Sequence, residues 1–177
     1  MTPEMSLAVF ASVVSLVELS LIVVTFSVTS RHFKIVRASS YIERFNSDEF
    51  VRTRMTVDAW LDRLWDRPYR ALAELDRDRE LNARVRLFAN LFQELAVGYY
   101  RGIVAKDVVA DTFDYLVPHY WGRLEPWVRT ARSAGSPTMY ANFERLGVHF
   151  GGGTAGGGEP IVFGRWDGDD EPYRRAA

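Results

Sequence analysis

The sequence predicts an all-α protein with a single N-terminal transmembrane helix, a cytoplasmic helical bundle and a flexible glycine-rich tail. Three observations lead to this fold class. Residues 6–30 contain no Lys, Arg, Asn, Gln or Pro and only one acidic residue. Beyond them, apolar residues recur at the i, i+3/i+4 spacing of amphipathic helices, without the alternation typical of strands. After residue 147 the composition changes to glycine and charged residues. We therefore divide the chain into an anchor (1–30), a bundle (31–147) and a tail (148–177).

Composition limits the chemistry available to the chain. Its 177 residues suffice for one domain with attachments. Cysteine is absent, which excludes disulfides, thiolate catalysis and cysteine-based zinc sites. The net charge of −1 gives no general attraction to nucleic acid, and we expect none as a partner.

The apolar run is long enough to cross a lipid bilayer. As a helix it extends roughly 37 Å, against a hydrocarbon thickness of about 30 Å. A cleaved signal peptide fits poorly, because no basic residue precedes the run and no A-x-A site follows it. A buried soluble helix is the other alternative, but a helix that is apolar all round usually marks contact with lipid. The run therefore predicts an uncleaved anchor.

The charges that flank the anchor predict its orientation. Arg31, Lys34 and Arg37 follow the run, and no Lys or Arg precedes it. Because cytoplasmic flanks are enriched in basic residues, the N-terminus is expected outside and the rest of the chain in the cytoplasm. The expected location is the inner (cytoplasmic) membrane, crossed once.

Small and polar residues form one stripe along the anchor when residues are projected at 100° intervals. The stripe consists of Ala8, Ala11, Ser15, Glu18, Ile22, Thr25 and Thr29. Small and hydroxyl side chains let helices approach closely, and an acidic residue at mid-membrane needs a partner or a proton. We interpret the stripe as a face for self-association into a homo-oligomer, or as a polar lining. A tolerated, protonated Glu18 in a lone helix is the alternative.

Helical periodicity continues past the anchor. Residues 31–45 are expected to extend the anchor helix into the cytoplasm, with Phe33, Val36, Tyr41, Ile42 and Phe45 as apolar positions. Asn46 is expected to cap the next helix, with Glu49 at capping-box spacing. That helix runs to about Trp65, and its inward side chains are Phe50, Val57, Trp60, Leu61 and Leu64. Pro68 then breaks the chain or starts a short helix, which carries Leu72 and Leu75.

The clearest periodicity lies in the segment RELNARVRLFANLFQELAVGYYRG, residues 79–102. Its inward residues are Leu81, Val85, Phe88, Leu91, Phe92, Leu95 and Tyr99, and Gly102 is a natural stop. Residues 105–132 continue the pattern, with Val109, Phe113, Leu116, Val117, Tyr120, Leu124, Trp127 and Val128 toward the core. Kinks are expected near Pro118 and Pro126. Four to six helices with short connections then make up the bundle.

A last short helix is predicted over residues 137–146. Ser136 would be its N-cap and Pro137 its first residue, and Gly147 would end it. The tail beyond contains one apolar island, IVFGRW at 161–166, which either docks on a partner or on the bundle or has no structure of its own.

One part of the sequence resembles a known family. The features are Asn90 and Glu94 on the long helix, the turn GIVAKD at 102–107, Phe113, Tyr120-Trp121, Pro126, and Tyr140 with Phe143-Glu144. Together they resemble a bacterial family known only as a domain of unknown function, made of small helical proteins that often carry an N-terminal membrane span. The resemblance covers roughly residues 40–147 and implies no activity. Gln93 stands where an acid is expected and Gly122 where a polar helix former is expected.

Catalytic motifs are absent, since the chain has no phosphate loop, H-E-x-x-H or G-x-S-x-G. No cofactor or metal is expected. The polar residues singled out as a network or ligand site are Asn90, Glu94, Arg101, Asp107 and His119. We interpret them as a structural network that fixes helix register; a cation or polar ligand, or His119 as a general base near Glu94, is the alternative. The acidic ridge of Asp107, Asp111 and Asp114 is expected to be solvated, because three ligands on one helix cannot surround an ion.

These observations predict a membrane-anchored cytoplasmic interaction or regulatory module that self-associates through its anchor. Its expected partners are the lipid bilayer, a second copy of the chain and a further protein. A membrane effector of the toxin or phage-defence type, whose polar stripe lines a lesion, is the first alternative. An enzyme or ligand-binding protein with a site around Asn90, Glu94 and His119 is the second.

Overall fold

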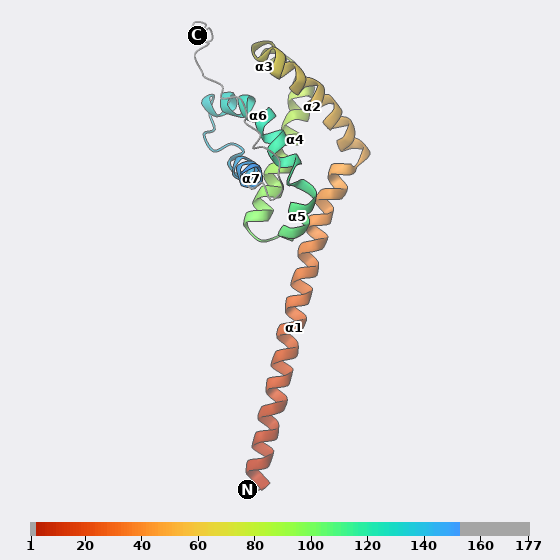
Figure 1. The fold of residues 1–177 in the computed structure, drawn as a ribbon, viewed down its shortest axis with the longest axis vertical. Helices are drawn as coiled ribbons and strands as arrows, with labels where there is room; N and C mark the ends of the chain where they lie inside the picture. Colours follow the sequence, from red (N-terminus) through yellow and green to blue (C-terminus); the bar gives the residue numbers. More distant parts are fainter. Residues whose placement is uncertain (1–2, 153–177) are drawn as a thin grey trace.

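A computed structural model describes the backbone of residues 3–152 and the side chains of residues 14–152. Within this part of the chain there are seven α-helices and no strand, which confirms the all-α fold class (Figure 1). The tail from residue 153, with IVFGRW, and the side chains of Ala8 and Ala11 lie outside the described residues.

The first helix, α1 (Pro3–Asn46), is 44 residues long and joins the apolar run to the bundle without a break. Figure 1 shows its N-terminal part projecting from the bundle as a single rod. The stretch Val14–Asn46 has a mean hydropathy of 1.5 in its most apolar window, and none of that window is buried. Among the described residues, α1 is therefore the one helix long and apolar enough to cross a membrane. The expected continuation of the apolar helix into the bundle is confirmed.

Two helices follow α1 and pack on each other, α2 (Asp48–Asp66) and α3 (Pro68–Arg77). The predicted cap of α2 is wrong: Asn46 is still helical, and Ser47 is the N-cap, with its Oγ 3.3 Å from the Phe50 N–H that it accepts. Ser47 has the extended backbone, φ −65° and ψ 147°, that an N-cap requires. Pro68 starts α3 at a position where its missing N–H costs nothing.

The long helix α4 (Arg79–Tyr100) lies at the centre of the bundle, and all seven of its predicted inward residues are buried. Asp78 caps its start by accepting from the N–H groups of Glu80 and Leu81, each at 3.0 Å. Its end is a Schellman motif, in which Gly102 has a φ of +64° and the N–H of Ile103 donates to the carbonyl of Gly98 at 2.9 Å. The predicted stop at Gly102 is confirmed.

The segment expected to be kinked near Pro118 is divided into two helices, α5 (Lys106–Phe113) and α6 (Leu116–Ser133). The helical hydrogen-bond pattern is interrupted at Asp114 and Tyr115, although both residues keep right-handed helical φ and ψ. Asp114 is the residue four positions before Pro118, where a proline ring clashes with a helical carbonyl. Pro126, in contrast, lies inside α6.

The last helix, α7 (Ala141–Gly151), begins and ends later than predicted. Ser136 and Pro137 belong to a turn in which the N–H of Met139 donates to the carbonyl of Ser136 at 3.1 Å, and the helix starts after Tyr140, which has a left-handed φ of +57°. Gly147 is buried within α7 and does not end it. A Cβ atom at Gly147 would lie 2.8 Å from Cβ of Trp121, so this glycine allows α7 to approach α6 closely.

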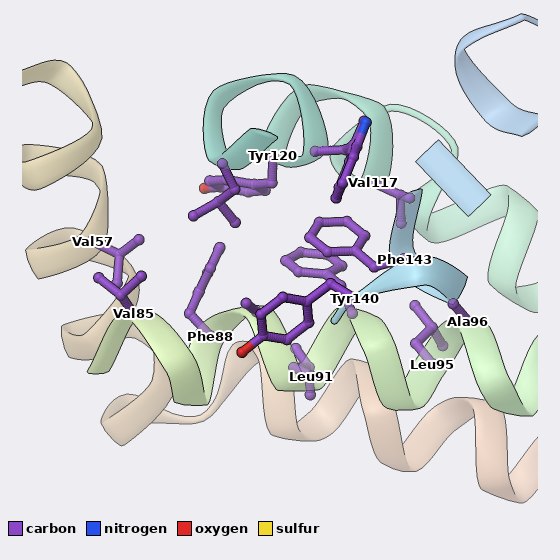
Figure 2. Packing of buried hydrophobic residues seen from close by; sticks show 14 of the residues in the cluster. Val57, Val85, Phe88, Leu91, Leu95, Ala96, Val117, Tyr120, Tyr140 and Phe143 are labelled. Atoms are coloured by element: carbon purple, nitrogen blue, oxygen red, sulfur yellow. The ribbon is translucent and has the colours of Figure 1, made fainter. Parts of the chain in front are cut away.

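The core is a single cluster rich in aromatic rings, to which all seven helices contribute. Phe88 and Phe92 of α4 make edge-on contact at 5.3 Å between ring centroids, and Phe143 of α7 stacks on Phe92 at 5.0 Å. Figure 2 shows Tyr120 of α6 above Phe88 and the α4 side chains Leu91 and Leu95 below Phe143. Phe45 of α1 joins the same cluster through Phe113 of α5, at 5.7 Å. The end of α1 is thus part of the core.

Candidate functional site

The junction between α1 and the bundle is held at two levels. Nearer the apolar run, the N–H of Ala105 donates to the carbonyl of Lys34 at 3.1 Å, which fixes the start of α5 beside α1. Further along α1, Ala38 and Phe45 are buried in the core, with 1% and 4% of their surfaces exposed. Because these contacts involve an unbroken helix, no linker separates the apolar run from the domain.

The side of α1 that packs on the bundle is opposite to the polar stripe. Phe45 lies 27 residues after Glu18 and Ala38 lies 20 residues after it. At 100° per residue these separations place both side chains about 180–200° around the helix from Glu18. The described stripe residues Ser15, Glu18, Ile22, Thr25 and Thr29 are exposed. The stripe therefore points away from the bundle.

A groove of about 300 Å³ lies between α1 and the end of α4. It is lined by Arg37, Ser40, Tyr41, Arg44, Glu94, Ile103 and Val104. Arg44 donates to Glu94 across the groove, with Nη1 3.0 Å from Oε2. Burial raises the pKa of the Tyr41 hydroxyl, the Glu94 carboxylate adds to this, and Arg44 and Arg37 oppose it. The Tyr41 hydroxyl is therefore a hydrogen-bond donor at neutral pH.

The structure does not bring the five polar residues named from the sequence into one site. Glu94 pairs with Arg44, and Asp107 Oδ2 lies 3.6 Å from Arg31 Nη2. The exposed side chains of Asn90 and Arg101 make no hydrogen bond or ion pair with a residue that the structure describes. His119 belongs to a different group, between α2 and α6. Sequence reasoning missed Arg44, because its partner Glu94 is 50 positions away and no local pattern joins them.

The group between α2 and α6 consists of Asp58, Asp62, His119, Tyr120 and Arg123. Arg123 forms ion pairs with Asp62 and, at 3.7 Å from Nη1 to Oδ1, with Asp58. The Tyr120 hydroxyl donates to Asp58 Oδ2 at 3.4 Å. Burial, then the Asp58 carboxylate, raises the pKa of Tyr120 to about 12. Burial and Arg123 lower the pKa of His119, against the opposing effect of Asp58.

At neutral pH this group contains a neutral imidazole, a protonated phenol and a guanidinium held between two carboxylates. The His119 ring lies between Tyr115 and Tyr120, with centroids at 5.7 and 5.1 Å. No hydroxyl nucleophile is hydrogen-bonded to His119 among the described residues. The arrangement suits a polar contact that fastens α6 to α2.

The family of the chain follows from a comparison with protein-family models. A model described as a domain of unknown function (DUF4760) matches residues 6–150. The chain belongs to the DUF4760 family. The match includes the apolar run and all the helices of the bundle, so it is broader than the resemblance over residues 40–147. Neither the curated proteins nor the solved structures compared with this DUF4760 chain gave a match.

Gln93 has a clear role in this DUF4760 domain. Its Oε1 accepts from the N–H of Phe143 at 2.9 Å, in the first turn of α7. Tyr140, the N-cap residue of α7, makes no side-chain cap hydrogen bond, so Gln93 on another helix takes the place of a local cap. An acidic residue, as expected from the sequence at this position, is able to accept the same bond.

Among residues 14–152, no group of three or more His, Asp and Glu side chains lies close enough together to hold a metal ion. Asp107, Asp111 and Asp114 are exposed, in agreement with a solvated ridge. A shallow depression of about 730 Å³ lies at the far end of the bundle and is open to solvent. Its lining residues are Arg70, Ala73, Glu74, Arg77, Asp78 and Arg79.

Proposed function

We propose that this DUF4760 protein is a membrane-anchored interaction or regulatory module, N-terminus outside and bundle in the cytoplasm, that self-associates through α1. The observation that carries the proposal is the continuity of α1. Its N-terminal part is wholly exposed in the described chain, and Ala38 and Phe45 of the same helix are buried in the core. A rotation or a change of partner in the anchor is therefore transmitted to the aromatic core without a flexible joint.

Two exposed apolar residues that continue the stripe toward the C-terminal end of α1 favour self-association. Phe33 and Val36 follow Ser15 and Glu18 by 18 residues, which is five helical turns, and so continue the same face. These two apolar side chains are 64% and 51% exposed. Because the bundle lies on the other side of α1, two anchors can meet along this face without a clash between their bundles. Buried between two copies, Phe33 and Val36 would lose contact with water.

Orientation follows from the charges at the junction. Arg31, Lys34 and Arg37 are exposed immediately beyond the apolar run. Basic residues at that end of an anchor favour retention of that end in the cytoplasm. These charges support the proposed orientation, with the bundle on the cytoplasmic side of the inner membrane.

Disulfide cross-linking tests the proposed face directly, since the natural chain contains no cysteine. Single cysteines replace Ile22 and Val36 on the stripe face, and Val23, about 140° from Glu18, as the matched control. We expect Ile22→Cys and Val36→Cys to form disulfide-linked dimers in isolated membranes and Val23→Cys to remain monomeric. Equal cross-linking at all three positions would argue against the stripe as the interface. Release of the wild-type chain from membranes by alkaline carbonate would argue against the anchor itself.

A further inference from the structure

The inference concerns the end of the bundle that faces the apolar run, and it rests on the proposed membrane anchorage. Arg31, Lys34 and Arg37 lie at this end on α1, and all three are exposed. In a helix the Cα–Cβ bonds tilt toward the N-terminus, so these side chains lean toward the apolar run. Arg37 lies seven residues beyond Ser30, or about 10 Å along the axis, next to a headgroup layer about 5–8 Å thick.

The loop between α4 and α5 adds two more cations at the same level. The hydrogen bond from Ala105 to the Lys34 carbonyl places this loop against α1 at the junction. Arg101 and Lys106 flank the loop and are exposed, with Lys106 Nζ 5.0 Å above the Tyr99 ring. Figure 1 shows the loop and the start of α5 at the end of the bundle from which the lower part of α1 emerges. Asp107 also lies here, but it pairs with Arg31.

The groove between α1 and α4 gives this basic end a concave part. Arg37 and Tyr41 line it, and Arg37 makes no ion pair with a residue that the structure describes. Arg44, deeper along α1, is already neutralised by Glu94 at 3.0 Å. A guanidinium with no carboxylate partner and a protonated phenol beside it are donors suited to phosphate oxygens.

We propose that Lys34, Arg37 and Lys106 bind the headgroups of anionic phospholipids, with one phosphate held in the groove between Arg37 and Tyr41. A lipid phosphate is favoured over a soluble phosphate compound as the ligand, because α1 is continuous and the groove opens beside the helix that is proposed to enter the bilayer. Ile103, in the loop between Arg101 and Lys106, is 37% exposed and lines the same groove as Arg37. The bound lipids hold the bundle in one orientation on the membrane surface.

Lipid retention by the full-length protein tests this binding. The chain is reconstituted in nanodiscs of equal parts phosphatidylcholine and phosphatidylglycerol, and the lipids that stay bound after release are counted by native mass spectrometry. The variant is Lys34→Gln/Arg37→Gln/Lys106→Gln. The control is Arg70→Gln/Arg77→Gln/Arg79→Gln, which removes the same charge from exposed positions at the far end of the bundle.

We expect the wild type and the control to retain phosphatidylglycerol in clear excess, and the junction variant to retain both lipids about equally. Each basic residue near an anionic surface changes partitioning by a factor of about five, so the loss is large enough to measure. Equal excess in the junction variant and the wild type would overturn the proposal, and so would a wild type without preference. Displacement of the lipid by millimolar glycerol phosphate would also overturn it, in favour of a soluble ligand. Failure of the wild type to enter nanodiscs contradicts the anchor and hence the proposed function, a result separate from the loss of lipid preference.

Discussion

Gln93 on α4 and Phe143 on α7 are joined by a hydrogen bond between the side-chain Oε1 and the backbone N–H at 2.9 Å, although 50 positions separate them. The first N–H groups of a helix have no partner within it, and α7 has no side-chain cap of its own. The central helix therefore completes the last helix. This contact makes the start of α7 dependent on its place in the bundle.

Gln93→Ala is expected to destabilise the protein by about 0.5–2 kcal/mol, the range for loss of an N-cap acceptor. Gln93→Glu is expected to be at least as stable as the wild type, because a carboxylate accepts the same bond and is favoured at a helix N-terminus. The measurement is denaturant unfolding of the detergent-solubilised protein. If Gln93→Ala unfolds like the wild type, the contact makes no contribution to stability.

Gly147→Ala tests the corrected course of α7. If Gly147 only ended a helix and had a negative φ, replacement by alanine would leave the stability of the protein unchanged or raise it. At Gly147 the added Cβ would lie 2.8 Å from Trp121 Cβ and Cγ. Overpacking typically costs about 1–3 kcal/mol, against a gain of about 1 kcal/mol in helix propensity. We expect a net loss of stability at Gly147 and a smaller effect for Gly151→Ala, where the nearest atom is Pro118 Cβ at 3.3 Å. A stabilised Gly147→Ala protein would contradict the packing of α7 on α6.

Sequence reasoning succeeded where a helix has many core residues and failed where a single residue decides a boundary. The seven inward positions of α4 repeat over five turns, so an error at one would leave the assignment intact. At the start of α2, in contrast, Asn46 and Ser47 are both good caps, and the choice depends on where α1 leaves the helical path. Gly147 reads as a stop signal in isolation, because nothing near it in sequence indicates the approach of Trp121.

The candidate site was less predictable than the fold for a related reason. The place of Glu94 beside the apolar face of α4 marks it as a candidate, but its partner Arg44 lies on α1, which is distant in sequence. The direction of the polar stripe relative to the bundle was equally inaccessible. This direction depends on the angle around the helix axis between Glu18 and Phe45. A single residue inserted between them would rotate the stripe by about 100° relative to the bundle.

The centre of the core is expected to be far more sensitive than the acidic ridge. Phe88 is 0% exposed and contacts Phe50, Phe92 and Tyr120, so Phe88→Ala is expected to cost about 3–5 kcal/mol. Asp111 is exposed, and Asp111→Ala is expected to change stability by less than about 0.5 kcal/mol. Both values come from the same denaturant titration. Similar losses at the two positions would mean that the ridge on α5 is buried or ligated.

His119 is expected to make the protein less stable in mild acid. Burial and Arg123 lower its pKa in the folded state below the ordinary value near 6.5. The unfolded chain then binds more protons in the window just below pH 6.5, so the free energy of unfolding falls as the pH falls through it. His119→Gln removes this contribution, and the variant should lose less stability than the wild type between neutral pH and about pH 5.5. Parallel pH profiles of the two proteins would show that His119 titrates normally.

Glu18 is expected to strengthen association of the anchors without being needed for insertion. Glu18→Leu removes a polar group that costs free energy in lipid, so the anchor should still insert. It also removes an interhelical hydrogen bond worth about 0.5–2 kcal/mol, which corresponds to a loss of a few-fold to roughly thirty-fold in dimer affinity. Glu18→Gln keeps the shape and a donor and should largely retain association.

Ser15→Leu should weaken association by separating the helices, and Val23→Leu, outside the stripe, is the matched control. Energy transfer between donor- and acceptor-labelled full-length chains in vesicles, titrated against lipid, gives the affinities. Equal affinities for the wild type, Glu18→Leu and Ser15→Leu would show that the stripe does not mediate association and that Glu18 is a tolerated residue in a lone helix. Any association of the protein would then involve another face.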